Sequence, residues 1–266
     1  MTTLTASHRL TFRGVVAGEW TKFWSLRSSW ITLGVSLLLI GALGAIAAFA
    51  WSPDAGGEVG PPGPLGPDGA DAVSIAISGT TFASLALGVL GVLVGAGEYT
   101  TGLIRATLTA VPSRLPVLWA KALVYGPIAL IAGVAGAFGA FAVGAPVLDG
   151  ESVSMVLSDD NVLRSLFGAG LYLGLVGVLG VALGILVRSS AGGIAILAGG
   201  LLILPGLAML LPSGWYDAID GYLPSTAGAQ IMSTTSDRPW TGLAIFAGWV
   251  AVTLAAAAYR LVKTDA

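Results

Sequence analysis

The charged side chains that could do chemistry in this sequence are concentrated in two short segments, residues 9–28 and 97–114. In the first, Glu19 falls within the apolar arc of a helical wheel, beside Trp20 and Phe23, and a carboxylate placed there is costly unless it is paired. Glu19 can extend its carboxylate toward water, or it can pair with Lys22, which lies one turn further on. The alternative is a contact with the second segment or with another protein.

The second segment, residues 97–114 within a connection of residues 97–119, combines a capped, amphipathic pattern with charges near the join between two apolar stretches. Thr100 or Thr101 is expected to cap a short helix at its N-terminus, and Pro112 is expected to end it. Glu98 would then lie near the positive end of that helix's dipole, where an acid is favoured. The apolar side of the helix would be formed by Leu103, Ile104, Leu108 and Val111. The pattern predicts a docking element; the alternative is a positively charged anchor with incidental helicity.

Several kinds of chemistry are excluded by residues that the chain lacks. It has no cysteine, which excludes disulfides and Cys-based zinc sites, and its single histidine, His8, argues against a Ser-His-Asp triad. A P-loop needs a lysine directly after a glycine, and Lys22, Lys121 and Lys263 do not follow one. We therefore expect no enzyme and no cofactor bound by this chain. The net charge of −2, without a basic run, argues against a nucleic-acid partner.

The elements that must position these residues are helices that cross a membrane. Hydrophobic residues make up 55% of the chain and charged residues 10%, with a mean hydropathy of +0.88, whereas soluble domains carry about 25% charged residues. A spanning helix needs about 20 apolar residues. Six stretches qualify, at about 30–50, 73–94, 120–143, 166–187, 192–211 and 241–259. The fifth is interrupted by Pro205 and Gly206. The predicted fold is an all-α polytopic membrane protein.

The spans divide the chain into segments with different surroundings. Residues 1–28 would form an N-terminal segment with an amphipathic interfacial helix, 29–260 the transmembrane domain and 261–266 a tail. With the N-terminus inside, only Arg164 and Arg238 of the 12 basic residues fall outside, which predicts an N-in, C-in topology. No ionisable residue lies well inside any span, which argues against a proton- or sodium-coupled carrier, although broken helices can bind sodium through backbone carbonyls.

The outer connections differ in character. Residues 52–71 are rich in proline and glycine and predict a flexible loop, and residues 144–165 form an acidic loop. Residues 212–240 are expected to form short helices at the outer leaflet. Their aromatic side chains suit the headgroup level: Trp215, Tyr216, Tyr222 and Trp240.

Small residues recur along the second span at a helical spacing. Gly91 and Gly95 form a G-x-x-x-G pair, and the fourth span contains two more such pairs. Small residues let helices approach closely, so the pattern predicts tight packing between spans. The alternative is a polar stripe that lines a transport pathway at Thr81 and Ser84.

The charged segments resemble those of one known protein family. Actinobacterial permease subunits of type-2 ABC transporters open with a motif that resembles Glu19-Trp20-Thr21-Lys22-Phe23-Trp24-Ser25-Leu26-Arg27-Ser28. Their segment after the second span resembles Glu98-Tyr99-Thr100-Thr101-Gly102-Leu103-Ile104-Arg105, followed by Pro112-Ser113-Arg114 and Lys121. Their outer segment before the last span resembles Leu223-Pro224-Ser225-Thr226-Ala227-Gly228. The resemblance covers essentially the full length of the chain.

The resemblance implies an ATP-driven export permease with six spans. In that family an N-terminal interfacial helix and the helix after the second span contact a separate ATPase, and the assembly holds two membrane subunits and two ATPases. Carried over to this chain, the interfacial helix would hold Glu19, Trp20, Lys22 and Arg27. The ATPase-coupling segment would hold Glu98, Tyr99, Gly102, Arg105, Pro112 and Arg114.

The leading hypothesis is therefore a non-catalytic permease subunit in the plasma membrane, which exports an amphipathic substrate that the sequence does not identify. Its partners would be an ABC ATPase in two copies, a second identical or similar permease, and the lipid bilayer. Two alternatives stay open. A self-contained carrier or channel would transport without ATP. A non-transporting immunity or binding protein would tolerate the loss of residues 9–28.

Overall fold

A computed structural model of the chain describes residues 11–51, 71–111, 113–151 and 153–263. Within these ranges every regular element is helical, and six helices are long and apolar enough to cross a membrane. They are Arg27–Phe49 (α2), Thr80–Thr101 (α4), Leu115–Gly144 (α6), Val162–Val187 (α7), Ser190–Ala208 (α8, η2 and α9) and Pro239–Lys263 (α12). The predicted all-α polytopic fold is confirmed, and the chain is a multi-pass membrane protein.

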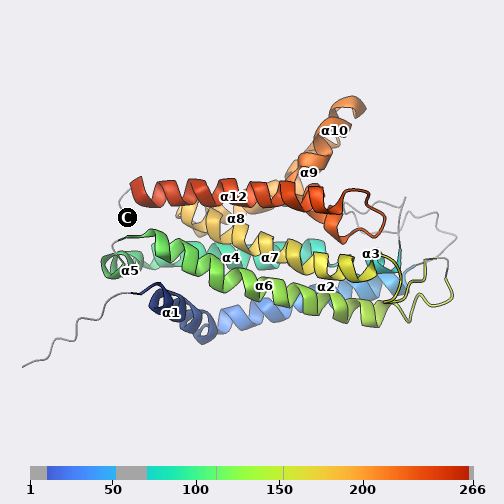
Figure 1. Cartoon of the computed structure of the whole chain (residues 1–266), viewed down its shortest axis with the longest axis horizontal. Helices are drawn as coiled ribbons and strands as arrows, with labels where there is room; N and C mark the ends of the chain where they lie inside the picture. The colour runs from blue at the N-terminus through green and yellow to red at the C-terminus, as the bar shows by residue number, and fades with distance from the viewer. Residues whose placement is uncertain (1–10, 52–70, 112, 152, 264–266) are drawn as a thin grey trace, which may run out of the picture.

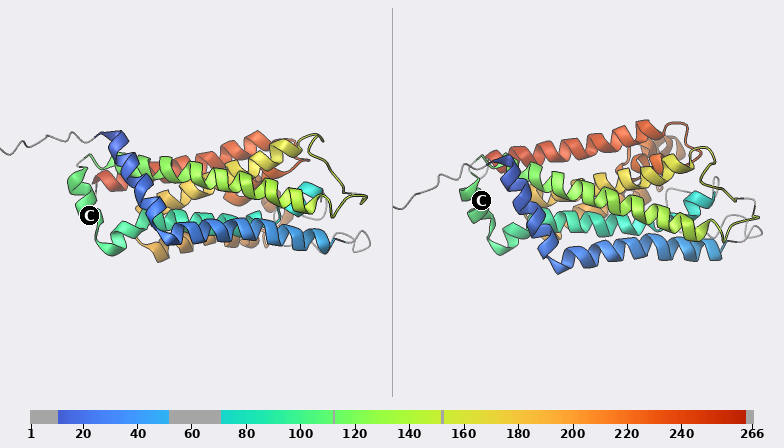
Figure 2. Two further views of the ribbon diagram at one scale, coloured as in Figure 1. Left: turned by 90° about the horizontal axis from the view of Figure 1, so that it is seen from below. Right: turned by 60° about the horizontal axis from the view of Figure 1, so that its bottom comes forward.

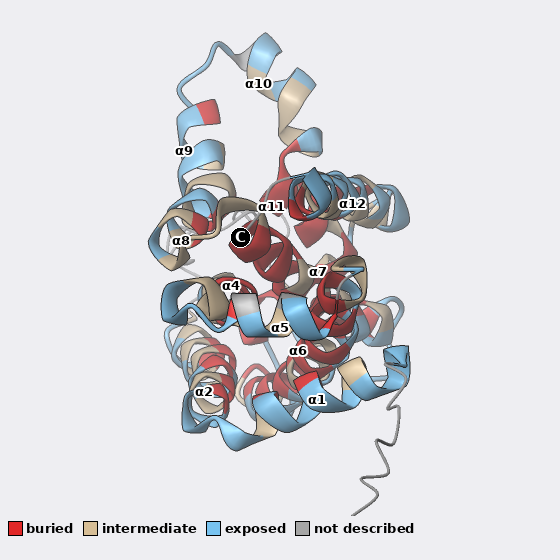
Figure 3. Cartoon of the chain, turned by 90° about the vertical axis from the view of Figure 1, so that its left-hand side faces the viewer, coloured by how far each residue is buried: buried red, intermediate tan, exposed pale blue. Residues whose placement is uncertain are grey.

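The six helices run side by side along the long axis of the molecule (Figures 1 and 2). The helix α7 lies at the centre, packs against α4, α6 and α12, and is the most buried of the six. Two shorter helices, α1 (Phe12–Ser25) and α5 (Ile104–Ala110), lie across one end of the bundle, which we call the α1/α5 end (Figure 3). The last helix, α12, also ends there (Figure 1). An even number of spans returns the chain to the side on which it began.

Glycines bring α4 and α7 into backbone contact at the centre of the bundle. A Cβ atom at Gly91 would lie 2.3 Å from the carbonyl oxygen of Gly177, and one at Gly180 would lie 2.2 Å from that of Gly88. No larger residue fits at such distances without moving a helix. The prediction of tight packing through small residues is confirmed.

The second span differs from its prediction of 73–94. Residues Ala72–Ala76 form a separate short helix, α3, and the span itself begins at Thr80. Asp71 starts α3 with a capping box, accepting from the Ser74 N–H at 2.7 Å. The chain then turns at Gly79, where a Cβ atom would lie 2.1 Å from the carbonyl oxygen of Leu39. Hydropathy alone does not separate such a buried turn of helix from the start of a span.

The helix α4 also ends beyond its predicted boundary, at Thr101, and Gly102 follows it. The hydroxyl groups of Thr100 and Thr101 donate to the carbonyl of Gly97, at 2.8 and 3.0 Å, so neither residue caps the start of a short helix. Glu98 lies in the last turn of α4, at the negative end of the helix dipole and not the positive end. The sequence predictions for these three residues are therefore wrong.

The fifth span continues through Pro205 because it contains a turn of π-helix, which is wider than an α-helix. It consists of α8 (Ser190–Ala198), the π-helix η2 (Gly199–Ile203) and α9 (Leu204–Ala208). Pro205 has no N–H to donate, and its ring would clash with the carbonyl four residues earlier in a regular α-helix. The π-helical turn directly before Pro205 changes that spacing, so the span continues through the proline.

The far end of the bundle carries the predicted short helices of residues 212–240. They are α10 (Ser213–Ile219), η3 (Asp220–Tyr222), α11 (Pro224–Ala229) and η4 (Gln230–Met232). The last two pack on α7 and α12, whereas α9 and α10 project from the bundle (Figure 1). Trp215, Tyr222 and Trp240 are exposed. Of the predicted Pro/Gly-rich loop, residues 52–70 lie outside the described residues, and only Asp71 is described.

Candidate functional site

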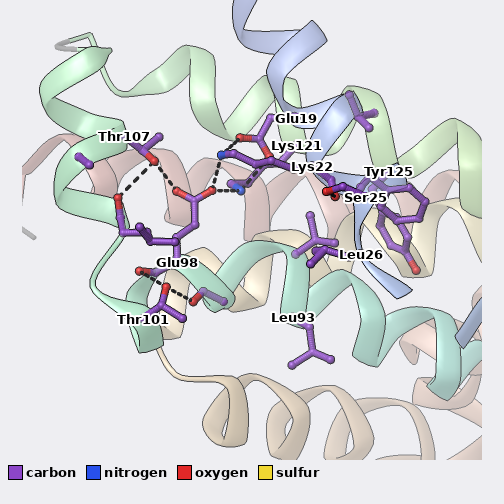
Figure 4. Close-up of a pocket in the computed structure, with 16 residues that line it drawn as sticks. Glu19, Lys22, Ser25, Leu26, Leu93, Glu98, Thr101, Thr107, Lys121 and Tyr125 are labelled. Carbon is purple, nitrogen blue, oxygen red and sulfur yellow. Dashed lines mark hydrogen bonds and ion pairs between the residues drawn. The ribbon is translucent and has the colours of Figure 1, made fainter. Parts of the chain in front are cut away.

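Four charged side chains from three helices meet at the α1/α5 end (Figure 4). Lys121 Nζ, on α6, lies 2.9 Å from Glu19 Oε2 on α1 and 2.7 Å from Glu98 Oε1 on α4. Lys22 Nζ, also on α1, lies 2.7 Å from Glu19 Oε1 and 2.9 Å from Glu98 Oε1. Each cation therefore bridges both carboxylates. We call Glu19, Lys22, Glu98 and Lys121 the four-charge cluster.

Three members of the four-charge cluster are buried or nearly so. Exposed fractions of the side chains are 3% for Lys121, 7% for Glu19 and 12% for Glu98, against 50% for Lys22. A buried charge without a partner costs several kcal/mol, and removal of one partner from a buried pair costs about 3–5 kcal/mol. The four charges cancel, so the cluster is stable as a unit but not as separate parts.

Glu98 is held by hydrogen bonds from three directions. Besides the two lysines, Thr107 Oγ1 on α5 donates to Glu98 Oε2 at 2.7 Å. These donors compensate for the unfavourable position of an acid at the C-terminal end of α4. Glu98 thereby connects α5 to α4, α6 and α1.

The helix α1 is oriented by the buried ion pairs. Thr11 caps its start by accepting a hydrogen bond from the Gly14 N–H at 3.2 Å, and the helix ends where Leu26 adopts an extended conformation. Its buried residues are Glu19 and Phe23, while Trp20 is 48% exposed. Glu19 pairs with Lys22, as one sequence alternative predicts, and with Lys121. Its link to Glu98 in the second charged segment is indirect, because it passes through these two lysines.

The half-exposed Lys22 has a perturbed proton affinity. Burial lowers the pKa of this ammonium group, but hydrogen bonds and charge interactions with Glu19 and Glu98 outweigh burial, so the pKa of Lys22 is raised above its ordinary value. The cation therefore persists across the neutral and mildly alkaline range.

The predicted coupling segment forms the turn and short helix that follow α4. Gly102 has φ +74°, the left-handed conformation that glycine adopts without strain, and it separates α4 from α5. Ile104 and Val111 are buried, whereas Leu103 is exposed. Arg105 lies on α5, but its side chain is outside the described part of the structure, as is the whole of Pro112.

Other predicted site residues lie at the same end of the bundle. The Arg188 guanidinium lies 5.4 Å from the centre of the Tyr99 ring, and Arg114 donates to the carbonyl of Leu261 at 3.3 Å. Arg27 is exposed at the start of α2. These contacts join the ends of α4, α7, α6 and α12. The structure thus gathers the described members of both predicted groups at one end.

The two proposed pathway residues lie deeper, on α4. Ser84 is buried, and its hydroxyl donates to the carbonyl of Thr81 within the same helix at 2.6 Å. A hydroxyl satisfied in this way behaves as a small packing residue. This geometry favours the packing alternative over a polar stripe, and a role for Thr81 and Ser84 in transport stays a prediction.

The sequence analysis did not predict that Lys121 bridges Glu19 and Glu98. A signal was present, because a lone lysine at the start of a long apolar run needs a counterion. Thr107, which bonds Glu98, had no such signal. The arrangement can hold helices together but offers no catalytic constellation, and in the described part of the chain no three His, Cys, Asp or Glu side chains are grouped as metal ligands.

Comparison with known proteins does not assign the chain to a family. No model of a known protein family matches the chain, and no curated protein sequence matches it.

Proposed function

We propose that this chain is the membrane-spanning permease subunit of an ATP-driven exporter of the type-2 ABC class, powered by separate ATPase subunits. The observation that carries the proposal is the four-charge cluster, because it fastens α1 to the ends of α4 and α6 beside the exposed helix α5. A bundle that only had to cross the membrane would gain little from ionic links between these elements.

The proposed contact surface for the ATPase is α5 and the turn before it. Leu103 and Ala106 are exposed there, beside the exposed Gly102, so a partner can reach this edge without displacing the bundle. With the N-terminus inside, as the basic residues favour, α5 and α1 would both face the cytosol, where ATP is available.

Force applied to α5 has a short route into the spans. Thr107 on α5 bonds Glu98, and Glu98 bonds Lys121 on α6 at 2.7 Å. Since separation of buried ion pairs is costly, α1 and the ends of α4 and α6 are expected to move together. Rigid motion of these helices against a second permease copy would switch access between the two sides of the membrane.

The proposed assembly contains two ATPases and two permeases in the plasma membrane. This chain would bind no nucleotide itself, since none of its lysines lies in a P-loop. The substrate would be amphipathic, in keeping with spans that are apolar apart from a few hydroxyls.

The test places a photoreactive amino acid at Leu103, purifies the tagged chain from its own cells, and identifies cross-linked proteins by mass spectrometry. We expect a protein with a P-loop at Leu103. The matched control is Leu157, an exposed leucine in the loop at the far end, where no P-loop protein should cross-link. Absence of a P-loop protein at Leu103 would contradict the proposal.

Reconstituted vesicles distinguish the alternatives. Efflux without ATP from vesicles that hold this chain alone would identify a carrier or channel. Unchanged cellular function after deletion of residues 9–28 would favour a non-transporting immunity or binding protein. An ATP-dependent efflux that requires both the ATPase and α1 is the outcome that the proposal expects.

A further inference from the structure

A cavity of about 490 Å³ lies next to the four-charge cluster, between α1, α4, α5 and α6 (Figure 4). Its walls are apolar over most of their extent, with Phe23, Val124 and Tyr125 among them. Its volume falls within the range of about 300–1,000 Å³ that is typical of ligand pockets. All four members of the four-charge cluster also line it, and so do Leu103, Ala106 and Thr107 from the α5 side. The cavity thus has a charged part at the four-charge cluster and an apolar part around Tyr125 and Leu93 (Figure 4).

The mouth of the cavity faces the surroundings of the bundle through exposed leucines. Leu26 is 53% exposed and Leu93 is 42% exposed, and both line the cavity. Leu93 precedes Glu98 by five residues on α4, which places it about 7.5 Å deeper along the helix axis. In a spanning helix this depth lies toward the hydrocarbon. The cavity therefore runs from headgroup level into the bilayer with the same order of polarity as a lipid.

One exposed basic residue adjoins the mouth of the cavity. The four members of the four-charge cluster cancel, and Arg27 is exposed directly after Leu26, which lines the cavity. Lys22 is half-exposed and uses two of its three N–H groups in the bonds to Glu19 and Glu98. The third N–H of Lys22 and the guanidinium of Arg27 are donors of the kind that bind a phosphate oxygen.

We propose that this cavity binds one acyl chain of an anionic phospholipid from the adjacent leaflet, with its phosphate at Lys22 and Arg27. The apolar walls accept the chain, and the basic rim selects the headgroup. The site would fill the space between α1 and α4 and so support the four-charge cluster from its apolar side. This inference does not depend on the proposed transport function.

The test is native mass spectrometry of the full chain after removal of lipid, titrated with phosphatidylglycerol or with phosphatidylcholine of the same acyl chains. We expect one tightly bound phosphatidylglycerol per chain. The substitutions Leu93→Trp and, as a second variant, Leu26→Trp place an indole at the mouth and should abolish that binding. The control Leu38→Trp, at an exposed apolar position on α2 outside the cavity, should leave it unchanged.

The headgroup part of the proposal has its own variant. Arg27→Gln should reduce the preference for phosphatidylglycerol over phosphatidylcholine about fivefold, which corresponds to about 1 kcal/mol for one basic residue near a lipid surface. The control Arg238→Gln removes an exposed basic residue at the far end and should not change the preference.

Three outcomes would overturn the inference. Binding that is equal in the wild type and in both tryptophan variants would show that the lipid does not occupy the cavity. Equal affinity for the two lipids would remove the role of the basic rim. Retention of an amphiphile other than a phospholipid, lost in Leu93→Trp, would assign the cavity to a different occupant.

Discussion

Replacement of Lys121 by methionine should release α1 from the bundle. The substitution removes two bonds, of 2.9 Å to Glu19 and 2.7 Å to Glu98, and leaves both carboxylates in a buried position. Loss of one partner from a buried ion pair costs about 3–5 kcal/mol. Lys22 still contacts both carboxylates and is half-exposed, so we expect the lower value, about 3 kcal/mol.

Hydrogen exchange of the α1 amides measures this change directly, because local opening of a helix exposes its amides to solvent. A loss of about 3 kcal/mol corresponds to an exchange rate more than about 100-fold faster in Phe12–Ser25. The matched control is Lys263→Met, which removes an exposed lysine that contacts the Tyr259 hydroxyl at 2.6 Å. Exposed contacts of this kind contribute about 0–1 kcal/mol.

A further variant separates two effects of Lys121→Met, the unpaired buried carboxylates that it leaves and the loss of the ion pairs themselves. If Lys121→Met is combined with Glu19→Gln and Glu98→Gln, no uncompensated buried carboxylate remains, but the ion pairs that hold α1 are gone too, so α1 should regain only part of its protection. Exchange of α1 in Lys121→Met that stays within about twofold of the wild type would refute the conclusion that the four-charge cluster holds this helix.

Three other perturbations test separate features. Gly180→Ala should strongly reduce the yield of monodisperse protein in size-exclusion chromatography, because its Cβ atom would lie 2.2 Å from the Gly88 carbonyl oxygen, whereas Gly97→Ala, with nothing within 4 Å, should not. Gly102→Ala should lower the free energy of unfolding by about 1 kcal/mol, because φ +74° disfavours alanine, and a melting temperature equal to that of the wild type would contradict this. The raised pKa of Lys22 means that its stabilisation is complete below the ordinary lysine pKa and is lost as pH rises through the raised value. Tryptophan fluorescence of α1 should therefore change only in strongly alkaline solution, and Lys22→Arg should shift that change to still higher pH.

The six spans could be predicted from hydropathy because the bilayer sets their length, and the basic residues indicated which ends share a side. The start of the second span could not. Residues 73–78 are as apolar as a span, but Asp71 caps them as a separate helix and Gly79 turns the chain against α2. The span also continues past its predicted end, so Glu98 lies in the last turn of α4, where its partners differ from those that its local sequence suggests.

The rotation of α1 illustrates a second limit. A helical wheel groups Trp20 and Phe23 on one apolar arc, yet only Phe23 is buried, and Glu19 is buried beside it. Hydrophobicity alone would turn Trp20 inward. The orientation of α1 depends instead on Lys121, which is 102 residues away in the chain. This buried lysine needs a counterion, and Glu19 supplies it only when its side of α1 faces the bundle. Such long-range pairing is not visible in local periodicity.

The glycine contacts between α4 and α7 leave α4 little freedom to tilt against its neighbour. A Cβ atom at Gly91 would lie 2.3 Å from the carbonyl oxygen of Gly177, and one at Gly95 would lie 2.4 Å from that of Val181, so the two backbones touch at successive turns of α4. A helix held at more than one turn has no single pivot. A displacement imposed at Glu98 would therefore carry α4 and α7 along together as one body.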